Sequence, residues 1–143
     1  MQSGSTPPLW FKAVTILLLL WALAGCASLY LHFAFGAEMD PNATDYDRRL
    51  YADLPTWFHA VYVAAVAAGL LGAVGLLLRR RWAFALSELS LIAVVIQFGW
   101  MFLVTDIVAV KGVWVTYFPA AIFGIQAFQL WLAFHAGRRG WLG

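Results

Sequence analysis

The chain has 143 residues, of which 64% are hydrophobic and only 11% are charged, and its mean hydropathy is +0.81. A water-soluble domain is about half apolar and about a quarter charged, so this composition excludes a soluble globular protein. The net charge of +2 is small and no basic run is interleaved with polar residues, so we expect no nucleic-acid partner. The single cysteine excludes an intrachain disulfide and a multi-cysteine metal or redox centre.

Four apolar runs, each close to the roughly 20 residues that cross a bilayer, follow one another along the chain. They cover residues 13–36, 57–78, 82–104 and 114–136. Because backbone polar groups in hydrocarbon must be satisfied within their own segment, each run is predicted to be a helix. The sequence therefore predicts an all-α, integral membrane four-helix bundle, with 1–143 as a single transmembrane domain and 37–56 as an acidic outer loop.

The first run contains Leu23-Ala24-Gly25-Cys26, which also fits the lipobox of a bacterial lipoprotein. In a lipoprotein the chain is cut before the cysteine, and a polar tether normally follows. Here the apolar run continues from Cys26 to Gly36, and the part before Cys26 is only as long as a signal-peptide core. We therefore interpret the run as a transmembrane helix that stays attached.

Small residues follow one side of the second run and are predicted to form a helix-packing seam. Lipid tails are as apolar as leucine, so membrane helices associate through close packing of small side chains. Alanine and glycine are also simply frequent in membrane helices, which is the alternative interpretation. Similar small pairs occur in the first run (Ala24, Ser28) and the fourth (Ala120, Gly124). The seam consists of Ala65, Ala68, Gly69, Gly72 and Gly75.

The distribution of Lys and Arg predicts the orientation of the bundle. Arg79-Arg80-Arg81 form a very short turn, so the second and third runs are expected to make an antiparallel hairpin. This turn falls on the same side as Lys12 and the pair Arg138-Arg139, which leaves both the N and C termini cytoplasmic and makes the arginines cytoplasmic anchors. The opposite side carries most of the acids: Glu38, Asp40, Asp45, Asp47, Asp53 and Asp106.

Glu88 in the third run is a costly residue for a membrane helix. It lies six residues past Trp82, which places it about 9 Å into the span. A charged carboxylate there costs on the order of a few kcal/mol unless it is paired, solvated or protonated. Glu88 is either a proton- or cation-coupling group or a near-interface acid that snorkels to the membrane surface or pairs with the arginines of the 79–81 turn.

Three glutamines lie deeper than Glu88. Gln97 is near the middle of the third run, and Gln126 and Gln129 are in the fourth. Neutral amides can bridge helices, at roughly 0.6–2 kcal/mol each, or can hydrogen-bond a hydroxylated ligand. With Glu88 they make up the candidate intramembrane polar site, although Glu88 and Gln97 project from opposite sides of their helix.

The three histidines lie near the ends of the runs. His32 and His59 are both near the outer face, where Asp53 or Asp106 could complete a metal site. No ligand spacing typical of such a site is present, so we expect ordinary interfacial histidines, no metal and no cofactor. The sequence also lacks a nucleophile paired with a base and a Gly-rich phosphate loop, so we expect no enzyme.

Several short pieces follow one another in a recognisable order. They are 21–26, Leu50-Tyr51 with Pro55 and Trp57, 69–72, 78–83, Ser90-Leu91, Gln97, Pro119 and 139–142. On these pieces the chain resembles a family of small four-span bacterial inner-membrane proteins that are commonly labelled sugar transporters. The resemblance implies a four-span fold and a multi-pass protein of the bacterial inner membrane, and it carries over no site residues.

Two functions fit these features. The preferred expectation is an accessory or scaffold subunit of a larger membrane assembly, with the lipid bilayer, other membrane subunits or a second copy as its partners. The alternative is an oligomeric carrier for a small solute such as a sugar, with the three glutamines as the first candidates to line its pathway and Glu88 as a further one. A lipid-modifying enzyme lacks support, because paired carboxylates and a His-rich cluster are missing within the runs.

Overall fold

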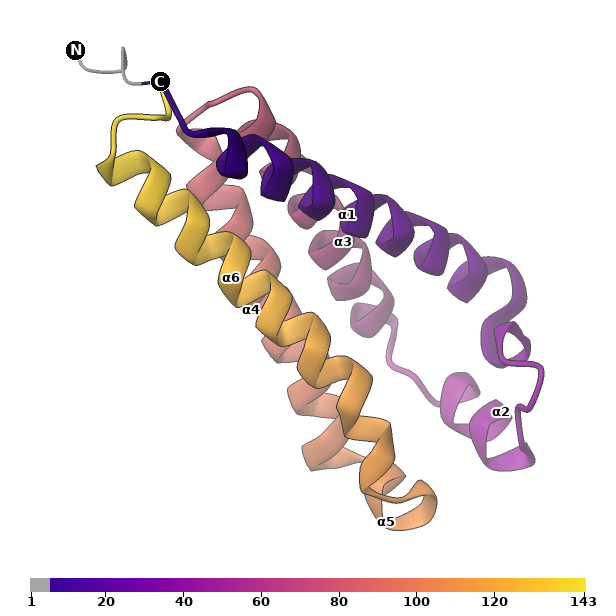
Figure 1. Ribbon diagram of the computed structural model, residues 1–143. Coiled ribbons are helices and arrows are strands. Elements are labelled where there is room, and N and C mark those ends of the chain that lie inside the picture. The colour runs from indigo at the N-terminus through magenta and orange to yellow at the C-terminus, as the bar shows by residue number, and fades with distance from the viewer. Residues whose placement is uncertain (1–5) are drawn as a thin grey trace.

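The computed structural model describes residues 6–143, and this part of the chain is helical and contains no strand. Four helices are long and apolar enough to cross a membrane, which confirms the all-α prediction with four candidate spans. They lie together as a bundle (Figure 1). These helices are α1 (Leu9–Phe35), α3 (Thr56–Leu77), α4 (Trp82–Val104) and α6 (Tyr117–Arg138).

Two of the long helices differ from the expected ranges at their starts. α1 begins at Leu9, because the apolar residues after Pro8 continue the helix toward the N-terminus. It ends before Gly36, whose φ of +58° suits glycine and stops the helix. α6 begins at Tyr117, because Val113–Thr116 form a 3-10 turn, η3.

Short elements connect the long helices at one end of the bundle. The 3-10 helix η2 (Gly36–Met39) and α2 (Asp45–Ala52) follow α1, and α5 (Ile107–Lys111) follows α4. Figure 1 shows α2 and α5 at the end of the bundle far from Pro8 and Gly143, so we call it the α2/α5 end and the other the termini end.

The long helices pack in a definite order. α3 packs along α4 as an antiparallel hairpin, α1 packs against α3, and α6 packs against α4. α1 and α6 lie close together at the termini end and separate toward the α2/α5 end (Figure 1). At the termini end, buried Phe11, Leu76, Leu132 and Leu142 belong to one core cluster.

The small residues of the seam on α3 are all buried between helices. A Cβ added at Gly72 would lie 2.7 Å from the Gln129 Nε2 and 2.7 Å from the Ser87 Oγ. A Cβ at Gly75 would lie 2.8 Å from the ring of Trp82. Only a residue without a side chain therefore lets α4 and α6 approach α3 this closely.

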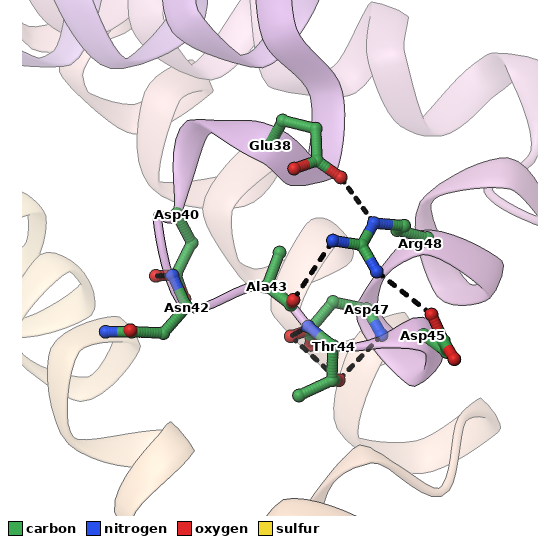
Figure 2. Close-up of polar contacts among 8 residues, drawn as sticks. All are labelled: Glu38, Asp40, Asn42, Ala43, Thr44, Asp45, Asp47 and Arg48. Carbon is green, nitrogen blue, oxygen red and sulfur yellow. Dashed lines mark hydrogen bonds and ion pairs between the residues drawn. The ribbon is translucent and has the colours of Figure 1, made fainter.

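The acidic loop at 37–56 folds into a capped helix. The Thr44 hydroxyl accepts a hydrogen bond from the Asp47 backbone N–H at 3.3 Å, and the Asp47 carboxylate accepts one from the Thr44 backbone N–H at 2.9 Å, which is a capping box at the start of α2. Arg48 pairs with Glu38 and with Asp45 (Figure 2). The loop is therefore an ordered cover at this end of the bundle.

The C-terminal residues pack on the turn between α3 and α4. The Gly143 N–H donates to the Arg79 carbonyl at 2.7 Å, and the Arg81 N–H donates to the Gly143 carbonyl at 3.1 Å. The Arg79 Nε donates to the Trp141 carbonyl at 2.9 Å. The structure thus gathers the 79–81 turn, Lys12 and the Arg138-Arg139 pair at the termini end, opposite the acidic α2 segment.

Candidate functional site

A cavity of about 310 Å³ lies between α1, α3, α4 and α6. Aromatic rings of Trp21, Phe98 and Phe118 form part of its wall, and small residues of α1 and α3 form much of the rest. Among residues 6–143, no charged side chain lines it. A mostly apolar pocket with a few polar groups is the usual form of a small-molecule site. The polar lining residues are Ser28, Tyr62, Ser90, Gln97 and Gln126.

The Gln126 amide is held in place by a hydrogen-bonded chain across three helices. Its Nε2 donates to the hydroxyl of Ser90 on α4, and that hydroxyl donates to the Ala65 carbonyl of α3 at 2.7 Å. Gln126 and Ser90 are both buried, so the bonds are shielded from competing solvent. The chain fixes one side of the cavity wall.

Gln129 makes a second bridge one turn farther toward the termini end. Its Nε2 donates to the Ser87 Oγ at 3.0 Å and to the Gly69 carbonyl at 3.2 Å. The Gln129 side chain is 1% exposed and is absent from the cavity lining. This glutamine therefore joins helices, which was one of its two sequence interpretations.

The two bridges follow one register between α4 and α6. Ser87 and Ser90 are three residues apart on α4, Gln126 and Gln129 are three apart on α6, and the helices are antiparallel. Residues three apart on a helix share a face, so each serine lies opposite one glutamine. Sequence analysis did not assign these serines to the site, although the matched spacing was a signal for them.

Gln97 lies on the same face of α4 but lacks a partner. It is seven residues beyond Ser90, and Pro119 is seven residues before Gln126, so continuing the register sets a proline against Gln97. Gln97 lines the cavity and is 6% exposed. Within residues 6–143 its amide makes no hydrogen bond, and its polar atoms are not fully enclosed by protein. The amide therefore reaches the open space of the cavity, where it can bond a ligand.

Glu88 lies away from the glutamines. It is exposed on the side of α4 that faces outward, whereas Gln97 is buried. Nine residues separate them, which is two and a half helical turns and puts them on opposite faces. Among residues 6–143 Glu88 makes no ion pair with the arginines of the 79–81 turn. The arginine pairing is thus not seen among these residues, whereas a coupling role and an acid that snorkels to the membrane surface both stay predictions.

The histidines near the α2/α5 end form a pair. The His32 Nε2 and the His59 Nδ1 are 2.9 Å apart, and the Tyr51 hydroxyl donates to the His32 carbonyl at 2.9 Å. One turn toward the cavity, the Ser28 Oγ and the Tyr62 Oη are 2.7 Å apart. No cluster of three or more His, Cys, Asp or Glu that could hold a metal ion occurs among the residues described.

Comparisons with protein-family models, with curated proteins and with solved structures found no match for the chain. The candidate site is thus the cavity, with Gln97 as its unpartnered polar group and Gln126, Ser90, Tyr62 and Ser28 as its ordered ones.

Proposed function

We propose that the protein is a small carrier of the bacterial inner membrane that binds an uncharged solute in the cavity between its four helices. The observation that carries the proposal is the Gln97 amide, which reaches the cavity from a largely buried side chain and is unbonded within residues 6–143. A polar group that is open for a hydrogen bond at the wall of a pocket favours a ligand that supplies one.

The lining chemistry indicates the class of solute. The amide and hydroxyl groups suit a molecule with hydroxyls, and the rings of Trp21, Phe98 and Phe118 suit an apolar face. The absence of charge from the lining disfavours an ionic solute, because a bare charge is costly to desolvate there. A small sugar or polyol meets these requirements, in agreement with the resemblance to proteins labelled sugar transporters.

The distribution of charge supports the orientation within this proposal. The termini end carries Lys12, the 79–81 turn and the Arg138-Arg139 pair, so the positive-inside rule assigns it to the cytoplasm. Four helices barely enclose a pathway, so the carrier would work as an oligomer. The outward-facing Ala120 and Gly124 of α6 offer a flat surface for a second copy.

Solute binding is tested by thermal unfolding of the purified protein in detergent. A solute that binds only the folded state raises the melting temperature, and the stabilisation grows with the logarithm of one plus its concentration over its Kd. We expect at least one of D-glucose, D-xylose, myo-inositol and catechol, each at millimolar concentration, to stabilise the parent protein. Gln97→Leu should abolish this shift, whereas Glu88→Gln, an amide swap on the outward face of the same helix, should retain it.

Uptake of the stabilising solute into proteoliposomes then separates a carrier from a simple binding protein. A melting temperature that none of the four solutes changes, or a shift that Gln97→Leu leaves intact, would contradict the assignment of the cavity.

A second candidate function is the accessory subunit, and one surface favours it. α6 turns large aromatic rings outward beside the small Ala120 and Gly124, and this face suits a neighbouring membrane helix as well as it suits lipid. Mild purification from native membranes tests this role, because a protein that always migrates alone would count against it. The outward rings are Phe123, Phe128, Trp131 and Phe134.

A further inference from the structure

The His32–His59 pair lies directly behind the polar wall of the cavity. His32 is four residues after Ser28 on α1, and His59 is three residues before Tyr62 on α3, so each histidine is one turn from a lining residue. The ring centroids of His32 and Tyr62 are 4.7 Å apart, and Tyr62 in turn bonds Ser28. The histidine pair therefore lies in the α1–α3 interface one helical turn beyond Ser28 and Tyr62, which line the cavity.

The two imidazoles are placed to hold one proton between them. In the neutral pair an N–H of one ring bonds the lone pair of the other at 2.9 Å, and the donor ring keeps a second, free nitrogen. A proton from the solution at the α2/α5 end adds to that free nitrogen and turns the donor into an imidazolium. The bond between the rings is then charge-assisted, and such bonds are roughly twice as strong as neutral ones.

The groups in ring contact with the pair include two tyrosines. Tyr51 of α2 and Tyr62 of α3 are the titratable side chains in ring contact with it, with centroids 5.1 Å and 4.7 Å from that of His32. A cation beside a tyrosine ring is stabilised by the ring quadrupole. Glu38 of η2 and Arg48 of α2 pair with each other, and no ion pair within residues 6–143 involves either histidine.

We propose that His32 and His59 together form a proton-binding site that controls access to the cavity, with the proton tightening the α1–α3 contact beside Ser28 and Tyr62. The proposal rests on the cavity being the solute site. It assigns the proton-linked role, which the sequence suggested for Glu88, to two histidines at the α2/α5 end. Imidazole is the side chain whose charge ordinarily changes between pH 5 and 8, which is why histidines serve as proton-binding groups.

The test is the pH dependence of a thiol placed in the cavity wall. Gly25 lines the cavity and has nothing within 4 Å of an added Cβ, so Gly25→Cys in a Cys26→Ser background reports access without a solute. Its rate of reaction with N-ethylmaleimide is measured at pH 5.5 and pH 7.5 in nanodiscs. His59→Gln keeps a hydrogen-bonding group but does not titrate, and His135→Gln at the termini end is the matched control.

A thiol reacts faster at higher pH in every variant. The quantity compared between variants is therefore the ratio of the rate at pH 7.5 to the rate at pH 5.5. We expect the parent and His135→Gln ratios to exceed the His59→Gln ratio at least about threefold, because the loss of the proton also loosens α1 in the first two proteins. Equal ratios in all three would overturn the proposal. His32→Gln serves as the second variant if His59→Gln unfolds.

Nitrogen NMR of the imidazoles supplies a readout that is independent of the cavity. One proton shared across the His32–His59 bond at pH 5.5 supports the site, and two separately titrating rings would overturn it. Tight binding of Zn²⁺ by the pair at neutral pH, with no shared proton, would also overturn it. Because neither measurement uses a solute, failure of the solute-binding experiment leaves these outcomes distinguishable.

Discussion

Lys111 and Asp47 form an ion pair that joins α5 to α2 across the α2/α5 end. The Lys111 Nζ lies 2.5 Å from the Asp47 Oδ1, and the side chains are 18% and 17% exposed, whereas the Arg48 pairs are far more open. Nearby, the Tyr46 hydroxyl donates to Asp106 at 2.7 Å, and burial together with this bond raises the pKa of Tyr46 to about 12. Pairs this distant in sequence could not be predicted from the order of residues.

Lys111→Met is expected to change how stability depends on pH. Partial burial raises the pKa of Asp47, but hydrogen bonds from Lys111 and Thr44 outweigh it and leave the pKa below its ordinary value. A carboxyl with a depressed pKa stabilises the fold above its unfolded pKa of about 3.9, and this stability is lost as the pH falls through the folded value. Lys111→Met should therefore cost about 1 kcal/mol at pH 7 and much less at pH 2.

Chemical unfolding of the parent and Lys111→Met in detergent at the two pH values measures this difference. Lys12→Met, which removes a lysine at the termini end, is the control and should show no such dependence. A destabilisation by Lys111→Met that is equal at both pH values would contradict the role of the pair.

The candidate site was only partly predictable at the residue scale. Composition and depth pointed to Gln97 and Gln126, because burying a neutral amide in an apolar run costs free energy unless the amide forms a hydrogen bond. The lack of a partner for Gln97 depends on Pro119 lying opposite it, and this depends on how far α6 slides along α4. Single-helix patterns do not carry that information, so Ser90 and Tyr62 were not predicted as site residues.

At the scale of helices, the seam on α3 sets how closely the hairpin and α6 approach. We expect Gly72→Ala to destabilise the protein by about 1–3 kcal/mol, because the new Cβ would overlap the Ser87 hydroxyl and the Gln129 amide. Gly124→Ala is the matched control, since nothing lies within 4 Å of its added Cβ. It should leave stability unchanged or raise it by up to about 1 kcal/mol, the intrinsic helix preference of alanine over glycine.

Reversible unfolding in mixed detergent micelles measures both variants against the parent. If Gly72→Ala and Gly124→Ala had the same effect, the small residues of α3 would not be a packing seam, and their number would reflect only the composition of membrane helices.

The elements themselves were largely predictable, and their ends less so. Length and hydropathy were enough for the four long helices, because hydrocarbon permits little else. α2 was missed, although Thr44-x-x-Asp47 is a capping-box pattern that indicates a helix start. The 3-10 turn before α6 arises from local geometry that hydropathy does not record.

At the scale of the whole molecule, the cavity lies between the α3–α4 hairpin and the two helices that flank it, α1 and α6. Charge patterning predicted that the arginine-rich segments share one end, and they do. It could not predict the cavity, because the tilt of α1 and α6 follows from side-chain packing across the bundle. The cytoplasmic assignment of the termini end stays a prediction.

The crossing of the bilayer by four helices is the claim on which the cavity, its solute and its proton site all depend. Single cysteines at Asn42 and Arg139, each in a Cys26→Ser background, test it with a membrane-impermeant thiol reagent on intact cells. Both positions are exposed and lie at opposite ends of the bundle. We predict labelling of Asn42→Cys in intact cells and of Arg139→Cys only after permeabilisation. Labelling of both positions in intact cells would contradict the four-span account.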